Sequence, residues 1–235
     1  MRYVTLGRTG LKVSVAGLGC GGHSRLGQRT GKTKDESVRL VRHALELGIN
    51  VIDTAEVYGT ETIVGEALQN VARDEVVLST KKLCPDAQVG DPAKELREGI
   101  EASLKRIGTD YVDVFYLHGV REEQYHSACD QLLPVLEEMR QQGKVRFIGV
   151  TEAFIRDPQH AMAATAVSHD HWDVMMIGFN MLNQSARKRV FPATLSKHIG
   201  TMGMFAVRKA LSRPAHLDKL LNELTEAGQV ESNVV

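Results

Sequence analysis

The sequence predicts an α/β fold in which helical crossovers connect the strands of a parallel sheet. Short runs of β-branched and aromatic residues alternate with stretches of helical periodicity, giving seven predicted strands between residues 15 and 207. No linker, low-complexity segment or long charge run divides the chain, so residues 1–235 are expected to form a single domain. Periodicity does not tell a closed barrel from an open doubly wound sheet, and both remain possible at this point.

The N-terminal part begins with a predicted hairpin. Its strands cover residues 3–6 and 11–15, and Arg8-Thr-Gly10 forms the turn between them. The first strand of the main sheet is expected over residues 15–19. Thr33 and Glu36 then have the spacing of a capping box, which predicts a helix that ends at Gly48. The inner side of this helix is expected to carry Leu40, Val41, Ala44, Leu45 and Leu47.

The rest of the chain repeats the alternation of strand and helix. Strands are expected over residues 50–54, 76–80, 112–117, 145–150, 174–179 and 200–207. Helices are expected over residues 61–70, 93–107, 128–142, 158–168, 185–198 and 214–227. Gly108 and Gly143 mark the ends of two of these helices.

The composition favours a cytoplasmic protein with a small-molecule partner. Lys and Arg (29) balance Asp and Glu (29), so neither nucleic acid nor an anionic membrane is expected as the main partner. Three scattered cysteines without a CxxC pair indicate a reducing compartment. No signal peptide and no apolar run of about 20 residues is found. His169-Asp-His171 lacks further ligands, so no metal is expected, and the choice between monomer and homo-oligomer stays open.

Two glycine-containing segments look like phosphate-binding motifs but lack the structure that such motifs need. Residues 17–22 match GxGxxG after a strand, yet the next helix begins about ten residues too late to present its N–H groups to a pyrophosphate. Residues 27–33 resemble a phosphate-binding loop that is one residue too short. We expect a mobile basic loop at the mouth of the sheet instead.

Four ionisable residues follow successive predicted strands and form the candidate catalytic group. Asp53 ends the second strand, Tyr58 lies in the loop after it, Lys81 ends the third strand and His118 ends the fourth. In a parallel barrel these strand ends share the face on which active sites form.

The combination suits carbonyl reduction. A hydride that reaches a carbonyl carbon leaves an alkoxide that needs a proton, which Tyr58 can donate if Lys81 lowers its pKa. Asp53 would hold Lys81, and a neutral His118 would orient the carbonyl oxygen. Because no side chain donates hydride, a nicotinamide cofactor is required. Each residue alone has an ordinary structural explanation, and only their joint position favours the catalytic interpretation.

Five segments surround these groups and consist of strands, helix ends or loops that lead to them. They are Val51-Ile-Asp-Thr-Ala-Glu-Val-Tyr-Gly59, Ser79-Thr-Lys81, Ser103-Leu-Lys-Arg-Ile-Gly108, Asp110-Tyr-Val-Asp-Val-Phe-Tyr-Leu-His118 and Gly143-Lys-Val-Arg-Phe-Ile-Gly-Val150. Together they resemble the aldo-keto reductase family over about residues 3–211. The resemblance implies a (β/α)8 TIM-barrel fold and an NADPH-dependent oxidoreductase of aldehydes or ketones, with NADH as the other possible cofactor. It also selects Lys81 over Lys82, since adjacent strand residues face opposite ways.

The cofactor-binding positions depart from the family pattern. Where the family usually has Ser-Asn to hold the nicotinamide amide, this chain has Thr151 and then a glutamate, whose ionised side chain offers only acceptors. The usual Gln of the sixth strand is replaced by Met176 or its neighbour Met175. Phe205, or Met204 before it, would lie under the nicotinamide ring. Arg208 would approach the cofactor phosphates.

After the predicted helix over residues 214–227 the chain reaches Val235 without an eighth strand or its helix. The expected fold is therefore a barrel that lacks this last unit, incomplete at its C-terminus, with weakened cofactor binding. Two alternatives to an active reductase follow: a catalytically weak cofactor-binding or regulatory protein, or an inactive truncated fragment. The sequence does not identify the substrate.

Overall fold

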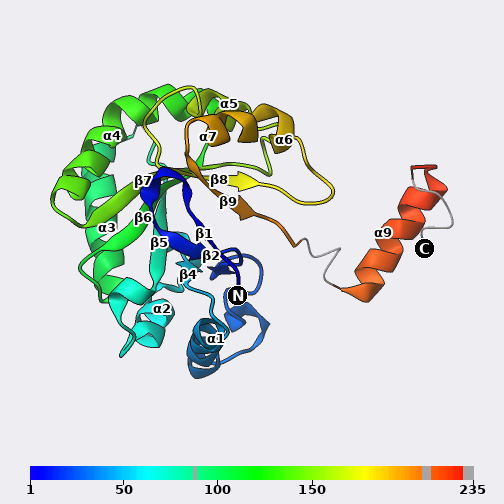
Figure 1. Cartoon of the computed structure of the whole chain (residues 1–235), viewed down its shortest axis with the longest axis horizontal. Helices are drawn as coiled ribbons and strands as arrows, with labels where there is room; N and C mark the ends of the chain where they lie inside the picture. Colours follow the sequence, from blue (N-terminus) through cyan, green and yellow to red (C-terminus); the bar gives the residue numbers. More distant parts are fainter. Residues whose placement is uncertain (87–88, 208–212, 230–235) are drawn as a thin grey trace.

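The central element of the computed structural model is a curled sheet of seven parallel strands (Figure 1), within the described residues 1–86, 89–207 and 213–229. Its strands are β3 (Leu18–Gly19), β4 (Val51–Asp53), β5 (Val77–Leu83), β6 (Val112–Val120), β7 (Val145–Glu152), β8 (Val174–Gly178) and β9 (Gly200–Met204). Each strand pairs with the next one along the chain. This order has no reversal, so the doubly wound alternative is wrong and the (β/α)8-type fold is confirmed.

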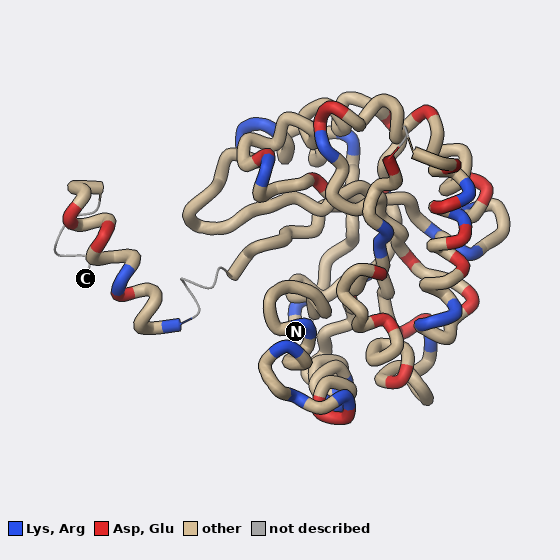
Figure 2. Tube along the Cα trace, turned by 180° about the vertical axis from the view of Figure 1, so that it is seen from behind, with Lys and Arg blue, Asp and Glu red and all other residues tan. Residues whose placement is uncertain are grey.

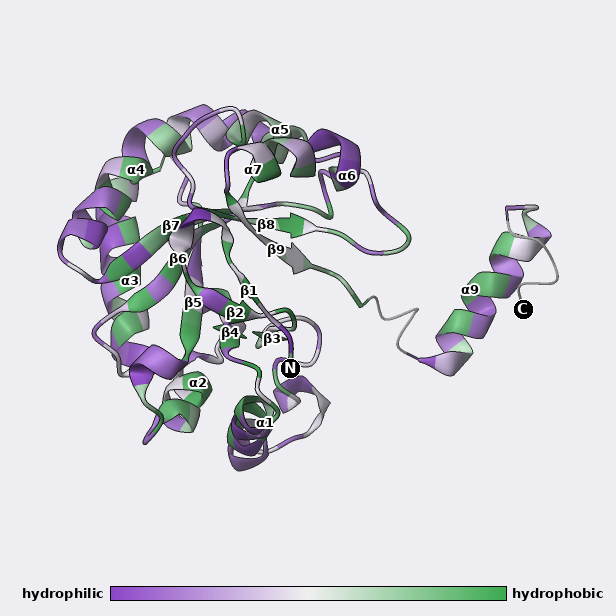
Figure 3. Cartoon of the chain, in the orientation of Figure 1, coloured by the Kyte–Doolittle hydropathy of each residue, from purple (hydrophilic) through white to green (hydrophobic). Residues whose placement is uncertain are grey.

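Helices cover the outer side of the curled sheet. They are α1 (Lys34–Glu46), α2 (Glu61–Leu68), α3 (Pro92–Ile107), α4 (Tyr125–Gln141), α5 (Ala161–Ala166), α6 (Ala186–Arg189) and α7 (Phe191–Ser196). The capping box of Thr33 and Glu36 is present at α1, and Gly108 ends α3 in the left-handed conformation with φ 75°. Purple, hydrophilic residues face outward on these helices (Figure 3), where basic and acidic residues are interleaved (Figure 2).

Two apolar cores lie on opposite sides of the sheet. The larger one packs the outer helices against the strands, with Leu96 of α3 and Phe115 of β6 fully buried in it. The second fills the inside of the curl with side chains such as Val114 and Tyr116. Such a double-sided core explains the near-continuous apolar runs of the central strands.

An antiparallel hairpin of β1 (Tyr3–Thr5) and β2 (Lys12–Ser14) closes one end of the curl, as predicted. Its Leu6, Leu11 and Val13 are buried in the inner core. Arg8, in the turn, donates to the carbonyl oxygen of Trp172 at 2.9 Å and forms an ion pair with Asp170. The hairpin is thereby fixed to the loop that precedes β8.

The curl is open between β3 and β9, the two edge strands of the described sheet. A cavity of about 1070 Å³ extends along this opening, from the hairpin to the carboxyl ends of the strands. Helix α9 (Pro214–Glu226) lies away from the sheet (Figure 1) and has no buried residue. None of the helices among the described residues combines the length and apolar character needed to cross a membrane.

The predictions for α1 and for the first strand need correction. Leu40 and Leu47 are 45% and 60% exposed, because the buried stripe of α1 runs through Val38, Val41 and Ala44 instead. Only Leu18–Gly19 of the expected strand over residues 15–19 pairs with β4. It is an edge strand beside the opening and is not buried.

Two predicted helices are also shorter or divided. The helix expected over residues 158–168 covers only Ala161–Ala166. The one expected over residues 185–198 is split into α6 and α7, with Val190 at φ −125°, ψ −53° between them. Pro192 stands in the first turn of α7, and without an N–H it cannot continue the hydrogen bonding of α6.

Candidate active site

Lys81 and Asp53 form a buried ion pair between neighbouring strands. The Lys81 side chain is 0% exposed, and its Nζ donates to both Asp53 carboxylate oxygens at 2.8 and 2.7 Å. It also donates to the carbonyl oxygen of Thr54 at 2.7 Å. Ser79 lies two residues earlier on the same face of β5 and donates to Asp53 Oδ1 at 2.6 Å. Each ammonium N–H therefore has an acceptor, and the carboxylate is held from two sides.

Tyr58 ends a single 3₁₀ turn after β4 and places its ring over this ion pair. Lys81 Nζ lies 5.0 Å from the centroid of the ring. The ring also packs against the backbone at Gly21, where an added Cβ would come within 2.4 Å of it. Burial raises the pKa of Tyr58 above its ordinary value, and the Lys81 ammonium opposes this without overcoming it. Lys81 thus acts on the pKa of Tyr58 in the expected direction, but burial is the larger effect and the net shift is upward.

His118 completes the group from β6. Its ring meets the Tyr58 ring edge-on, with centroids 5.6 Å apart and an interplanar angle of 90°. Burial, together with the nearby Lys81 charge, lowers the pKa of His118 to about 4, so the imidazole is neutral at neutral pH. Its Nδ1 atom is buried without a hydrogen-bond partner among the described residues.

Lys82, next to Lys81, faces the outer helices. Its Nζ contacts Glu56 at 3.1 Å and Glu95 at 3.2 Å, and its stem packs against Gly99 of α3. Lys81 and Lys82 therefore lie on opposite faces of β5, as the alternation of side chains along a strand requires. Of these two lysines, Lys81 is the one that contacts Asp53 and Tyr58.

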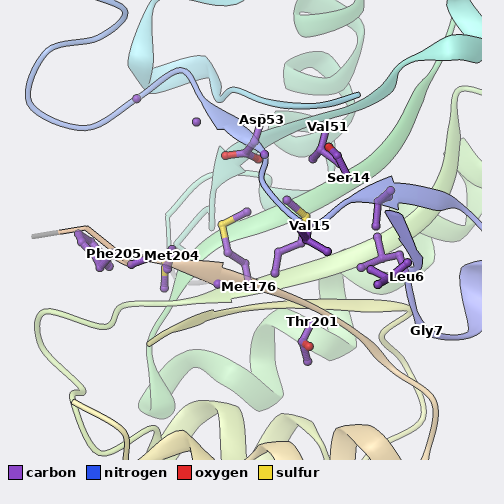
Figure 4. A pocket seen from close by; sticks show the side chains of 18 of the residues that line it. Leu6, Gly7, Ser14, Val15, Val51, Asp53, Met176, Thr201, Met204 and Phe205 are labelled. Atoms are coloured by element: carbon purple, nitrogen blue, oxygen red, sulfur yellow. The ribbon is translucent and has the colours of Figure 1, made fainter. Parts of the chain in front are cut away.

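The cavity described above reaches these residues at the carboxyl ends of the strands. Asp53, Tyr58 and His118 line it there. Figure 4 shows Asp53 and Met176 on facing walls, with Met204 and Phe205 at one end of the view. Met176 is thus the methionine of β8 that faces the cavity, whereas Met175 is buried in the outer core.

Thr151 and Glu152, which were expected to stand near a nicotinamide amide, are both engaged within the protein. Thr151 Oγ1 accepts a hydrogen bond from the Gly119 N–H at 2.8 Å. Glu152 is fully buried and accepts from the Gly178 N–H at 2.7 Å and from His160 Nδ1 at 2.9 Å. Burial raises the pKa of Glu152, and both hydrogen bonds oppose this shift. Neither Thr151 nor Glu152 lines the cavity.

Phe205 follows β9 and lines the cavity. Its backbone is in the left-handed region at φ 58°, and its carbonyl oxygen accepts from Asn180 Nδ2 at 3.2 Å. Its ring stacks on Phe154, with centroids 5.5 Å apart. The prediction for Arg208 falls outside the described residues.

Two site residues escaped the sequence reasoning. Ser79 holds Asp53, and its position two residues before Lys81 on one strand was the available signal. Gly21 supports the Tyr58 ring, because any larger residue at this position would collide with it. Nothing in the local sequence connects Gly21 with Tyr58.

The comparisons with known proteins agree on one family. The profile of the Aldo/keto reductase family matches residues 17–222. Among curated relatives, the chain is 36% identical over 160 residues to the uncharacterized oxidoreductase YqkF of Bacillus subtilis, a match that covers 64% of this chain and 49% of that protein. It is 37% identical over 154 residues to L-galactose dehydrogenase of Arabidopsis thaliana, covering 62% and 47%. The chain spans about half the length of these relatives.

Solved structures with the same fold include two bacterial enzymes. The holo form of an aldo-keto reductase from Bacillus halodurans has a TM-score of 0.72 and 24% identity, covering 95% of this chain and 76% of that one. An aldo-keto reductase from Klebsiella pneumoniae in complex with NADPH has a TM-score of 0.67 and 25% identity, covering 87% and 67%.

Proposed function

The chain belongs to the aldo/keto reductase family, and from this premise we propose that it is an NADPH-dependent oxidoreductase that reduces an aldehyde or ketone to an alcohol. One observation carries the proposal: a tyrosine hydroxyl group and a neutral imidazole face one cavity above a buried lysine–aspartate pair. This arrangement supplies a proton donor and a hydrogen-bond donor at one place, which reduction of a carbonyl group requires.

The cavity fits a flat nicotinamide ring. Met176, Met204 and Phe205 offer apolar and aromatic surface close to the strand ends, and such side chains pack well against a planar ring. These residues would hold the cofactor, which supplies the hydride when it is bound. We prefer NADPH to NADH because the family implies it and because the related Klebsiella pneumoniae structure is a complex with NADPH.

Tyr58 is the proposed proton donor. Its raised pKa keeps the hydroxyl group protonated at neutral pH, as a general acid requires. When the proton leaves, the Lys81 ammonium 5.0 Å from the ring stabilises the phenolate. Asp53 and the Thr54 carbonyl oxygen fix that ammonium in place.

His118 is the proposed group that orients the substrate. It is neutral at neutral pH, so one ring nitrogen carries a proton and the other does not. Because Nδ1 is buried without an acceptor, we place the proton on Nε2, from which it can be donated to a carbonyl oxygen in the cavity.

The test combines NADPH binding with turnover by the whole chain. We expect NADPH fluorescence to report saturable binding, and a panel of aldehydes to oxidise the bound NADPH. Tyr58→Phe should lower kcat by about 10²-fold to 10⁴-fold, the usual range for loss of a general acid, while the Kd for NADPH changes less than about twofold. Tyr111→Phe is the matched control, since Tyr111 packs on Arg73 away from the cavity. An unchanged rate in Tyr58→Phe would refute the proton-donor assignment.

A second candidate is a cofactor-binding protein without turnover. The engagement of Glu152 by His160 and Gly178 favours it, because the side chain at the position that holds the nicotinamide amide in the family is already used within the protein. Binding of NADPH without its oxidation across the panel would support this candidate. Absence of binding would exclude both functions and leave an inactive fragment.

A further inference from the structure

Arg25 lines the same cavity as Tyr58 and His118. It belongs to the loop that follows β3, four residues after Gly21, which touches the Tyr58 ring. Four residues span at most about 14 Å when fully extended, so Arg25 lies near the catalytic group. It is the only Lys or Arg among the described residues that line this cavity.

Arg25 is half-buried as a residue, and its guanidinium makes no hydrogen bond or ion pair with the described residues. Asp53, the acidic residue among the described residues that line the cavity, is already paired with Lys81. A guanidinium that belongs to a cavity-lining residue and offers five N–H donors without an acceptor among the described residues can bind an anion from outside the chain.

The backbone of the loop holds Arg25 in an unusual conformation. Arg25 and Leu26 have φ values of 47° and 58°, a strained region for residues other than glycine. Leu26 is buried in the outer core, and its carbonyl oxygen accepts from Ser37 Oγ at 2.9 Å. The strain is thus held by packing, as is common where a side chain is positioned for a ligand.

We infer that Arg25 is an anion-binding residue of the cavity and that its ligand is a carboxylate or phosphate group on the carbonyl substrate. This inference rests on the proposed function, because the substrate is defined by the reduction at Tyr58. The diphosphate of the cofactor is the other source of the same chemistry. A substrate source fits better because Arg25 shares its loop with Gly21, against which the proposed proton donor packs.

The experiment compares 4-carboxybenzaldehyde with its neutral methyl ester in the whole chain and three variants. In Arg25→Gln we expect the ratio of kcat/KM for the acid over the ester to fall about 10-fold to 100-fold, as for a lost charge-assisted hydrogen bond. Arg25→Lys keeps the charge and should retain most of the ratio. Arg29→Gln is the matched control, because Arg29 is exposed in the same loop and does not line the cavity.

Two binding measurements distinguish whether the anion that Arg25 binds belongs to the substrate or to the cofactor. Inorganic pyrophosphate should bind to the unmodified chain and not to Arg25→Gln. This titration does not depend on turnover, so it tests the anion site even if the chain reduces no aldehyde. Arg25→Gln could instead raise the Kd for NADPH at least tenfold and lower kcat/KM by the same factor for the acid and the ester. That result would overturn the assignment to the substrate in favour of the cofactor. If the acid-to-ester ratio and both titrations match the unmodified chain, Arg25 is no anion site.

Discussion

At the scale of single residues, the buried Lys81–Asp53 pair links the stability of the fold to its chemistry. Lys81→Met leaves the Asp53 carboxylate in a nearly buried position with Ser79 as its remaining side-chain partner. We expect the free energy of unfolding, measured in urea, to fall by about 3–5 kcal/mol, as for other buried pairs that lose one member. The double variant Asp53→Asn/Lys81→Met should recover part of this loss. A loss below about 1 kcal/mol in Lys81→Met would contradict the ion-pair interpretation.

The lowered pKa of His118 predicts that the stability of the fold depends on pH. Its pKa is about 4 in the folded chain and 6.5 for an unperturbed histidine, so the unfolded chain binds the proton first as pH falls. The free energy of unfolding should therefore decrease between pH 6.5 and pH 4, by up to about 1.4 kcal/mol per pH unit from this group. His118→Asn should remove that slope, whereas His43→Asn, at an exposed position on α1, should keep it. Equal slopes in both variants would show that the pKa of His118 is not lowered in the folded chain.

The positions of Asp53, Tyr58, Lys81 and His118 could be read from the sequence because strand ends are local features that a parallel sheet brings to one side. Their catalytic roles remain predictions. The contacts of Glu152 were out of reach, because its partners His160 and Gly178 lie in different segments. The net rise in the pKa of Tyr58 was missed for a similar reason, since burial is a property of the folded chain.

At the scale of elements, α3 and α9 both carry apolar residues at helical spacing but differ in how far these residues are buried. Leu96 of α3 is fully buried, whereas α9 has no buried residue. Leu96→Ala should lower the free energy of unfolding by about 2–5 kcal/mol, and Leu220→Ala should change it by less than about 0.5 kcal/mol. Urea unfolding of both variants is the measurement. A large loss in Leu220→Ala would show that α9 packs on the barrel in solution.

Helix starts were predicted best where side-chain chemistry fixes them, as at Thr33 and Glu36. The break at Val190 was not predicted, although Pro192 lacks the N–H group that would continue the hydrogen bonding of α6. The burial of Leu40 was wrongly expected because a run of apolar residues on α1 is wider than the stripe that touches the sheet.

At the scale of the whole molecule, the open curl leaves β9 as an edge strand with exposed Thr201. Unpaired backbone groups at such an edge favour association with another chain, and lysine at the edge discourages it. We expect the apparent mass in light scattering to rise with protein concentration, and Thr201→Lys to suppress the rise. Thr30→Lys adds the same charge in a loop and should not suppress it. A constant monomer mass for the unmodified chain at every concentration would contradict this prediction.

The contacts of the N-terminal hairpin determine when it can reach its final position during synthesis of the chain. Each strand of the sheet pairs with the strand that precedes it in the sequence, so strands can be added to the sheet in the order in which the ribosome releases them. The turn of the hairpin is different, because Arg8 contacts Asp170 and Trp172, and the Arg8 N–H donates to the carbonyl oxygen of His198. Residues 6–8 are synthesised before residues 170–200 and therefore have to wait for them, and until then Leu6 lacks its packing against Gly200 of β9. A nascent chain arrested before residue 170 should leave this end open to proteases and chaperones.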